Sequence, residues 1–411
     1  MTKYINKTNL IVIVIIFLAL RLTDFNQSMT SYWVGPYLSA AVNFDWSQFV
    51  LNVNMEEIKH FSQLLQGDEY FEYKFNTVNN YIEYDYLAKG LVLLVILAKK
   101  IFFFLGDLEA LQYLQYLVHI LLSIFILTLF EKKYQKILFL ILYAVNPLVL
   151  WVVNYPFYYF WQVIPSLIFV YWHLKKDIKL PLMVIFSTAF AFIYITRPTV
   201  LLLVILFYFL FALKNNFKYA LAGFALFFGL INIAPKLNIG PWHTMYVGIG
   251  AYENPYGIAL SDEDGYKYYK EQTGKLVNSG NIMQEEIKKD YYKVLKGRYF
   301  SIVEEDPVMI IKHAILNTIQ AYSIGYSHSL NQKFGNKIIY LSVLVGLIFM
   351  GLLIYTKQYV LFLAIGFASG GFTLYYPPIL TYMFGSFILL VVGVIGVIDY
   401  FLQQKHLKNV A

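Results

Sequence analysis

Long apolar runs joined by short lysine-containing connections constrain this chain more than any other feature. Hydrophobic residues make up 59% of its 411 residues and charged residues 14%, against about 45–50% and about 25% in soluble proteins. A water-soluble fold of this size has too much surface to hide that excess. The runs are continuous rather than alternating, so they predict helices rather than a β-barrel. The chain also lacks cysteine, which excludes disulfides and thiolate metal sites.

The sequence predicts an all-α polytopic membrane protein with about 10–12 transmembrane helices and two large extracytoplasmic loops. An N-terminal module, 1–235, contains the first polar loop at 23–86, and the second polar loop occupies 236–337. Residues 338–411 form the last helices and a cytoplasmic tail. The expected spans are 9–22, 87–105, 109–130, 137–153, 158–174, 180–196, 198–213, 219–235, 338–355, 358–375 and 379–402.

Two further helices are expected outside the membrane core. Residues 46–65 carry apolar side chains at helical spacing with one polar face, which predicts a helix on the membrane surface. Residues 308–325 are amphipathic, with Lys312 and His313 on one side, and are expected to lie along the interface.

Charge places the two polar loops on one side of the membrane. Most carboxylates fall within 24–85 and 253–306, whereas lysines gather in short connections at 132–136, 175–179 and 214–218. Short lysine-rich loops stay in the cytoplasm, so the acidic loops are expected outside. Eight apolar segments precede the second loop. The two loops can lie on the same side of the membrane only if an odd number of these segments crosses it. Either 87–105 or 158–174 is therefore expected not to cross.

Arginine usage points to function. The chain has 29 lysines and three arginines, namely Arg21, Arg197 and Arg298, all on the predicted outer side. A planar guanidinium binds phosphate or carboxylate in a way that lysine cannot. The alternative is contact with lipid headgroups. No continuous basic face is present, so a nucleic-acid partner is not expected.

Carboxylates near helix ends are the candidate general bases. Asp24 follows the first helix, Asp45 precedes the expected surface helix, and Glu56 and Glu57 lie in its middle. Such a group can take a proton from an acceptor hydroxyl or amine. For Asp45 the alternative is a helix N-cap.

Breaks between apolar runs supply candidate binding residues. Arg197 lies before Pro198, where a charge between two apolar segments is expensive unless it faces a cavity, and it is predicted to clamp a phosphate. The alternative is a side chain that reaches the headgroups. Tyr155, in the aromatic stretch 154–159, belongs either to an interface belt or to a wall that stacks on a sugar.

The segment 240–257 opens the second loop with glycines and aromatic residues. Trp242, Tyr246 and Glu253 are predicted to bind a polar ring, and His243 to carry a proton or bind phosphate. Alternatively, His243 is merely solvated. The acidic triplet 262–264 is not expected to bind a metal, because adjacent carboxylates point apart.

The layout resembles that of the GT-C membrane glycosyltransferases, which include protein O-mannosyltransferases and aminoarabinose transferases. Asn-Pro-Leu-Val-Leu at 146–150, Thr-Arg-Pro-Thr at 196–199 and Tyr-Tyr-Pro-Pro at 375–378, which includes Tyr376, are similar to short family motifs. The acidic pair that usually follows the first helix is missing; 68–69 is such a pair but lies late in the loop.

The resemblance implies transfer of a sugar from a polyprenyl-phosphate carrier to a glycan, lipid or protein outside a bacterial cytoplasmic membrane. Arg197, Arg21 and His243 would stabilise the departing phosphate, a carboxylate of the first loop would act as base, and no metal would be needed. The alternatives are a lipid-linked glycan flippase or other transporter, and an O-antigen polymerase or ligase.

Overall fold

The computed structural model describes residues 7–23, 31–45, 51–64, 72–77, 82–83, 88–175, 178–233, 240–278, 281–282, 285–323 and 336–410. These residues are mainly helical. The one sheet among them joins two short antiparallel strands, β1 (Asn52–Val53) and β2 (Ile82–Glu83). The predicted all-α class is confirmed, apart from this short pair of strands.

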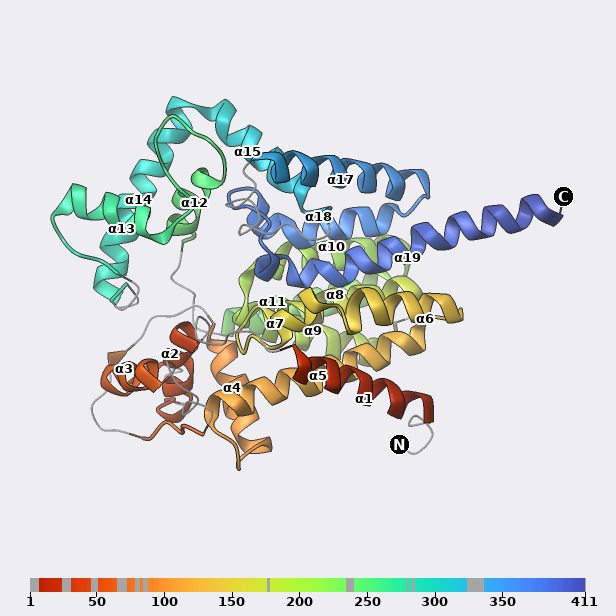
Figure 1. The fold of residues 1–411 in the computed structure, drawn as a ribbon, viewed down its shortest axis with the longest axis horizontal. Coiled ribbons are helices and arrows are strands. Elements are labelled where there is room, and N and C mark those ends of the chain that lie inside the picture. The colour runs from red at the N-terminus through yellow and green to blue at the C-terminus, as the bar shows by residue number, and fades with distance from the viewer. Residues whose placement is uncertain are drawn as a thin grey trace.

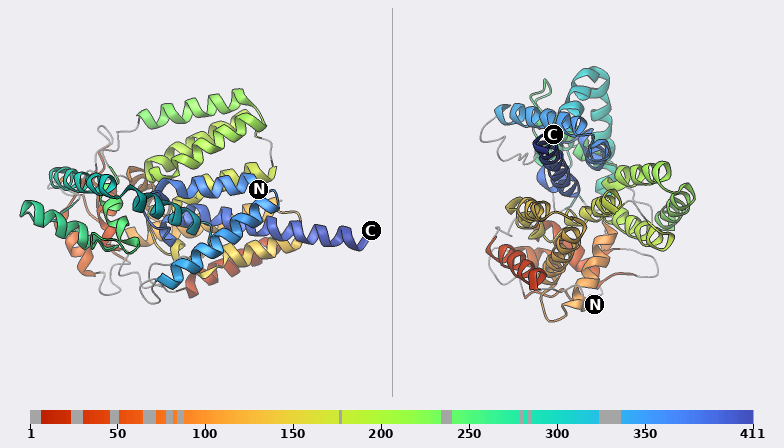
Figure 2. Two further views of the ribbon diagram at one scale, coloured as in Figure 1. Left: turned by 90° about the horizontal axis from the view of Figure 1, so that it is seen from above. Right: turned by 90° about the vertical axis from the view of Figure 1, so that its right-hand side faces the viewer.

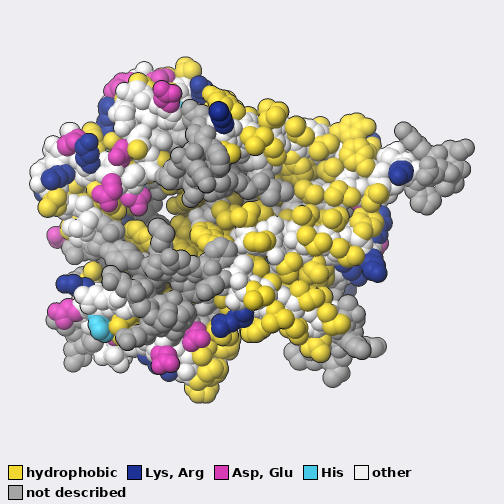
Figure 3. Space-filling model, viewed as in Figure 1, with side chains coloured by type: hydrophobic (Ala, Val, Ile, Leu, Met, Phe, Trp, Pro, Cys, Tyr) yellow, Lys and Arg dark blue, Asp and Glu magenta, His cyan; other side chains and the backbone are white. Residues whose placement is uncertain are grey.

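Apolar helices form a bundle with its long axis horizontal in Figure 1, and the views in Figure 2 show them roughly aligned with one another. The bundle helices are α1 (Lys7–Leu22), α5 (Asp107–Leu129), α6 (Lys133–Phe139), α7 (Pro147–Val153), α8 (Val163–Lys175), α9 (Leu180–Thr196), α10 (Leu201–Lys214), α11 (Phe217–Ile233), α17 (Asn336–Tyr355), α18 (Tyr359–Thr373) and α19 (Leu380–Val410). Apolar side chains also cover the visible outside of the bundle, whereas acidic side chains gather at one end (Figure 3). An apolar exterior of this kind is suited to lipid.

Three of the described helices are long and apolar enough to cross a membrane: Asp107–Leu129, Lys337–Tyr355 and Leu380–Lys405. The pair Lys133–Ala144 and Pro147–Val153, bent by 53°, would make a fourth, and five further apolar helices are shorter. A helix rises 1.5 Å per residue, so a helix of 17 residues such as α9 covers about 26 Å of the roughly 30 Å hydrocarbon core. The number of crossings, expected as about 10–12, stays a prediction.

The bundle has two chemically different ends. We call the end at Asn154 and Thr196 the loop end, because the helices of both acidic segments gather there in Figure 1. The opposite end, at Lys132, Lys175 and Lys214, is called the lysine end. Asn154 ties the loop end together: its Nδ2 donates to the Thr23 and Leu150 carbonyls at 3.3 and 3.0 Å.

Helix α4 (Lys89–Ile101) does not run between the two ends. A Cβ on Gly90 would stand 2.1 Å from Oγ1 of Thr196, at the C-terminal end of α9. Near the other end of α4, Nζ of Lys99 lies 2.7 Å from Oδ2 of Asp107, the first residue of α5. Both ends of α4 therefore lie at the loop end. Of the two segments expected not to cross, 87–105 is the one that stays at one end of the bundle, whereas α8 runs on to the lysine end. Which of them crosses a membrane stays a prediction.

The first polar segment contains α2 (Ser31–Val42) and α3 (Met55–Leu64). The predicted helix over 46–65 is wrong at 51–54, and its residues 46–50 lie outside the described part of the chain. Residues 52–53 form strand β1 instead. Helix α3 begins after Asn54, whose Oδ1 accepts the backbone N–H of Glu56 at 3.0 Å and of Glu57 at 3.3 Å. Asn54, rather than Asp45, is thus the helix cap. Helix α2 was not predicted.

The second polar segment has a core of its own, formed by α12 (Trp242–Gly248), α13 (Asp262–Thr273), α14 (Glu285–Glu305) and α15 (Pro307–Gln320). Helix α15 covers most of the amphipathic stretch predicted at 308–325. Its His313 is buried while Lys312, the next residue, is exposed. The two side chains therefore do not share one face.

Candidate functional site

A cavity of about 310 Å³ lies at the loop end, where the bundle meets both polar segments. This volume is at the lower end of the range for small-molecule sites. Trp33 of α2 contributes from the first segment, residues 155–159 and Arg197 from the bundle, and His243 from the second segment. We call it the loop-end cavity. Its ionisable side chains other than tyrosine are Arg197, His243, Asp262 and Lys288.

Arg197 is held among aromatic rings. Its guanidinium carbon lies 4.7 Å from the ring centroids of Tyr158 and Tyr382 and 5.1 Å from that of Tyr159. Rings this close attract a cation electrostatically. The Nε atom of Arg197 is buried without a hydrogen-bond partner among the described residues. The faces of the tyrosine rings thus hold the Arg197 guanidinium in place, and its Nε–H remains a donor for a ligand.

The fold places Arg197 by ending α9 directly before it. The backbone at Arg197 is extended, with φ −151° and ψ 97°, and Pro198 cannot continue the ladder of helix hydrogen bonds. A Cβ on Gly371 of α18 would stand 2.3 Å from the carbonyl oxygen of Thr199, so α18 packs directly on the break. The tyrosines come from residues 158–159 and from α19, more than 200 positions later in the chain.

His243 faces the same cavity from the second segment and is engaged at both ring nitrogens. Its Nδ1 lies 2.6 Å from the hydroxyl oxygen of Tyr291, and its Nε2 lies 3.0 Å from Oδ1 of Asp262. The ring also stacks on Tyr266, at 5.8 Å between centroids. The hydrogen bond from His243 lowers the pKa of the Asp262 carboxyl, which is therefore ionised at neutral pH.

Four of the predicted binding residues meet in the loop-end cavity: Arg197, His243, Tyr155 and Tyr376. These positions are far apart in the chain, and the bundle brings them together. Tyr155 belongs to the aromatic wall rather than to a scattered belt, since its ring lies 5.9 Å from that of Tyr159 in a stacked arrangement.

Other predicted binding residues do not line the cavity. Arg21 is exposed and lies near Glu109 at the start of α5. Trp242 packs on Phe300, 5.6 Å between ring centroids, and Tyr246 is buried in the core of the second segment. Glu253 is exposed.

The carboxylates predicted as bases are likewise not among the residues that line the cavity. Asp45 follows α2, and Glu56 is exposed. Glu57 accepts the Asn76 backbone N–H at 2.8 Å, a bond that joins two parts of the first segment. Asp24 lies outside the described residues.

Sequence reasoning missed Asp262, Lys288, Trp33 and Tyr382. In the sequence, Asp262 is one member of the acidic triplet 262–264, which is not expected to bind a metal. Its signal was the preceding Ser261, whose side chain accepts the Glu263 backbone N–H and caps α13, which fixes where Asp262 stands. Within the described part of the chain, no three His, Asp or Glu side chains are grouped as metal ligands.

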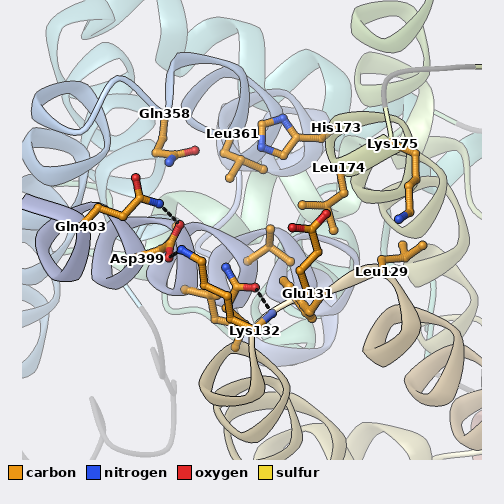
Figure 4. Close-up of a pocket in the computed structure, with 15 residues that line it drawn as sticks. Leu129, Glu131, Lys132, His173, Leu174, Lys175, Gln358, Leu361, Asp399 and Gln403 are labelled. Carbon is orange, nitrogen blue, oxygen red and sulfur yellow. Dashed lines mark hydrogen bonds and ion pairs between the residues drawn. The ribbon is translucent and has the colours of Figure 1, made fainter. Parts of the chain in front are cut away.

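A second cavity, of about 340 Å³, lies at the lysine end and is shown in Figure 4. Its Asp399 already has partners within the chain. Lys132 forms an ion pair with it, Tyr134 donates a hydrogen bond, and Gln403 Nε2 donates at 2.7 Å. These contacts join α19 to the start of α6. The Asp399 carboxylate therefore already bonds to side chains that hold two helices together, which favours the loop-end cavity as the candidate site.

Comparison with known proteins adds no relative. No protein-family model matches the chain, and neither the curated proteins nor the solved structures contain a significant match.

Proposed function

We propose that the protein is a glycosyltransferase of GT-C type, which moves a sugar from a polyprenyl-phosphate carrier to a glycan, lipid or protein acceptor. The loop-end cavity is its active site, and the lipid tail of the donor lies along the apolar surface of the bundle. In this proposal the chain crosses a bacterial cytoplasmic membrane many times, with the lysine end in the cytoplasm and the loop end outside.

Arg197 is the observation that carries this proposal. A cation beside a membrane-facing bundle suits a lipid phosphate, and a guanidinium with a donor lacking a partner can bind phosphate oxygens directly. The phosphate gains negative charge as its bond to the sugar breaks, and a cation preorganised at that point stabilises the transition state. Lys288, also in the cavity and almost fully buried, adds a second positive charge.

The aromatic wall supports a sugar as the group that is transferred. Tyr155, Tyr376 and Trp33 present rings to the cavity together with few charged groups. Flat apolar faces with a small number of polar atoms are what a binding site needs to hold and orient a compact polar ligand.

Binding of undecaprenyl phosphate to the purified protein in detergent tests the phosphate site, with native mass spectrometry as the readout. Arg197→Ala should abolish binding while the protein still folds and inserts. Arg298→Ala is the matched control, because Arg298 is paired with Glu305 at 3.3 Å and does not line the cavity. Equal binding by wild type and Arg197→Ala would overturn the proposal.

Orientation is tested with single cysteines, since the native chain has none. Glu263→Cys should react with a membrane-impermeant thiol reagent from outside the cell, and Lys133→Cys only after the membrane is opened. Labelling of both positions from the same side would exclude the proposed topology. Glycan analysis of a deletion strain then separates the rival functions: a missing sugar branch supports a transferase, whereas loss of all long chains indicates a polymerase or ligase.

A further inference from the structure

Among the described residues that line the loop-end cavity, Asp262 is the one that carries a carboxylate. It is the first residue of α13, and its side chain is 53% exposed. Oδ1 accepts from His243, whereas Oδ2 has no hydrogen-bond partner among the described residues. One oxygen is therefore fixed by the protein, and the other is available to a substrate hydroxyl.

The hydrogen bonds of His243 define where its proton lies. The ionised carboxylate of Asp262 only accepts, so Nε2 must carry the proton of a neutral ring. Nδ1 then accepts from the hydroxyl of Tyr291, 2.6 Å away. Tyr291 is fully buried, and burial raises the pKa of its phenol, which keeps the hydroxyl protonated as a donor. Tyr291, His243 and Asp262 thus form a chain of donors that ends at the cavity.

Backbone packing keeps this chain of donors tight. Gly265, one turn after Asp262 on α13, leaves room where a Cβ would stand 2.4 Å from the Tyr291 hydroxyl oxygen and 3.0 Å from Nδ1 of His243. A larger residue at this position would therefore push the two side chains apart. The three side chains come from α12, α13 and α14, whose packing forms the core of the second segment.

We propose that Asp262 is the general base of the transfer, and that His243 and Tyr291 are positioning residues that orient its carboxylate toward an acceptor hydroxyl. This inference rests on the proposed function. It assigns the base to the second polar segment rather than to the first. An ionised carboxylate there can take the proton of an acceptor hydroxyl as the new bond forms.

The acceptor oxygen attacks the anomeric carbon of the donor sugar while its proton moves to Oδ2 of Asp262. The bond between the anomeric carbon and the phosphate oxygen breaks, and its electron pair leaves with the polyprenyl phosphate. Arg197 stabilises the added negative charge. Release of the proton from Asp262 to water restores the site.

The test uses membranes of a deletion strain that carries each variant, so that the native donor and acceptor are both present, and measures the release of undecaprenyl phosphate. Asp262→Asn should slow release roughly 10²–10⁴-fold, the usual contribution of a general base. Glu263→Gln is the matched control, because Glu263 is the exposed neighbour and does not line the cavity; it should release undecaprenyl phosphate at the wild-type rate.

The pH dependence of undecaprenyl phosphate release distinguishes residues that orient Asp262 from residues that only stabilise the fold. Besides tyrosines, the ionisable side chains that line the cavity together with Asp262 are His243 of α12, Lys288 of α14 and Arg197 in the bundle wall. His243→Phe removes the hydrogen bond that favours the ionised carboxylate, so the acidic limb of the profile should move to higher pH. Tyr291→Phe should cause a smaller shift in the same direction.

These experiments test the role of Asp262 as base separately from the role of the loop-end cavity as the active site. Wild-type release by Asp262→Asn, with undecaprenyl phosphate binding still dependent on Arg197, would overturn the assignment of the base alone. If Asp262→Asn fails to fold, the profile of His243→Phe decides, since an unchanged acidic limb would overturn the proposal. Loss of the dependence on Arg197 counts against the proposed function instead.

Discussion

Gly265 and Tyr291 approach so closely that no side chain fits between them. A Cβ on Gly265 would stand 2.4 Å from the Tyr291 hydroxyl oxygen, and the Tyr291 ring is fully buried. The hydroxyl is also the atom that bonds to His243. The contact therefore links the packing of α13 on α14 to the orientation of a side chain in the loop-end cavity.

Gly265→Ala should consequently destabilise the second segment by about 1–3 kcal/mol, the usual cost of overpacking a core. Thermal unfolding in detergent measures this loss. Gly297→Ala is the control, since Gly297 lies within α14 with open space around it, and it should be neutral or stabilising by up to about 1 kcal/mol. Equal unfolding temperatures for the two variants would show that the contact is relaxed in solution.

Arg197→Lys should fail to replace arginine. The lysine keeps the positive charge but loses the planar group that lies near the rings of Tyr158 and Tyr382, and it loses the donor at Nε. One charge-assisted hydrogen bond contributes about 1.5–3 kcal/mol, so undecaprenyl phosphate should bind roughly 10–100-fold more weakly. Titration by native mass spectrometry measures the change, with Arg298→Lys as the control. Unchanged affinity would mean that charge alone is required.

Lys99→Met should destabilise the protein by about 3 kcal/mol, because it leaves Asp107 as an unpaired carboxylate whose side chain is 2% exposed. Asp107 Oδ2 also accepts the Phe75 backbone N–H at 2.9 Å. The double variant Lys99→Met/Asp107→Asn removes the charge but keeps an acceptor, so it should recover most of the loss. Denaturant unfolding of both variants tests this coupling, and Lys100→Met, at an exposed position, is the control.

Acid should destabilise the packing of α15 through His313. Burial lowers the pKa of His313 from 6.5 to about 4. Between these two values the unfolded chain binds a proton that the folded chain does not, so stability is lost as pH falls through this window. The loss between about pH 7 and about pH 5 should be about 2 kcal/mol.

His313→Phe isolates this contribution, because its ring keeps the contact with Tyr252, 4.6 Å between centroids in the native protein. The variant should show a smaller fall in unfolding temperature over the same pH range than the wild type. The same slope in both proteins would assign the pH dependence to other groups.

Local patterns in the sequence predicted much of the bundle. The apolar run 180–196 is the same as helix α9, and the break at Arg197-Pro198 lies where it was expected. Hydropathy and helix-breaking residues act over a few neighbouring positions, so they can be recognised without knowledge of the fold. The same reasoning found Arg197, His243, Tyr155 and Tyr376, because charged or aromatic residues at helix breaks are unusual wherever they occur.

The surface helix shows the limit of such patterns. Apolar spacing at 46–65 suited a helix, but pairing of Asn52–Val53 with Ile82–Glu83 and the cap at Asn54 decided the outcome. Likewise, hydropathy left open whether 87–105 or 158–174 fails to run the length of the bundle. Contacts of Gly90 with Thr196 and of Lys99 with Asp107 answered that question.

By itself, the chain of residues determined a lipid-compatible set of helices and the positions at which they break, since both follow from local hydrophobicity and backbone chemistry. Only the tertiary structure decided that Asp262 stands beside His243, and that Tyr382 closes a cage around Arg197. These contacts join positions separated by loops or by nearly half of the chain, and they form because helices pack at specific faces. That packing leaves no trace in the spacing of neighbouring residues.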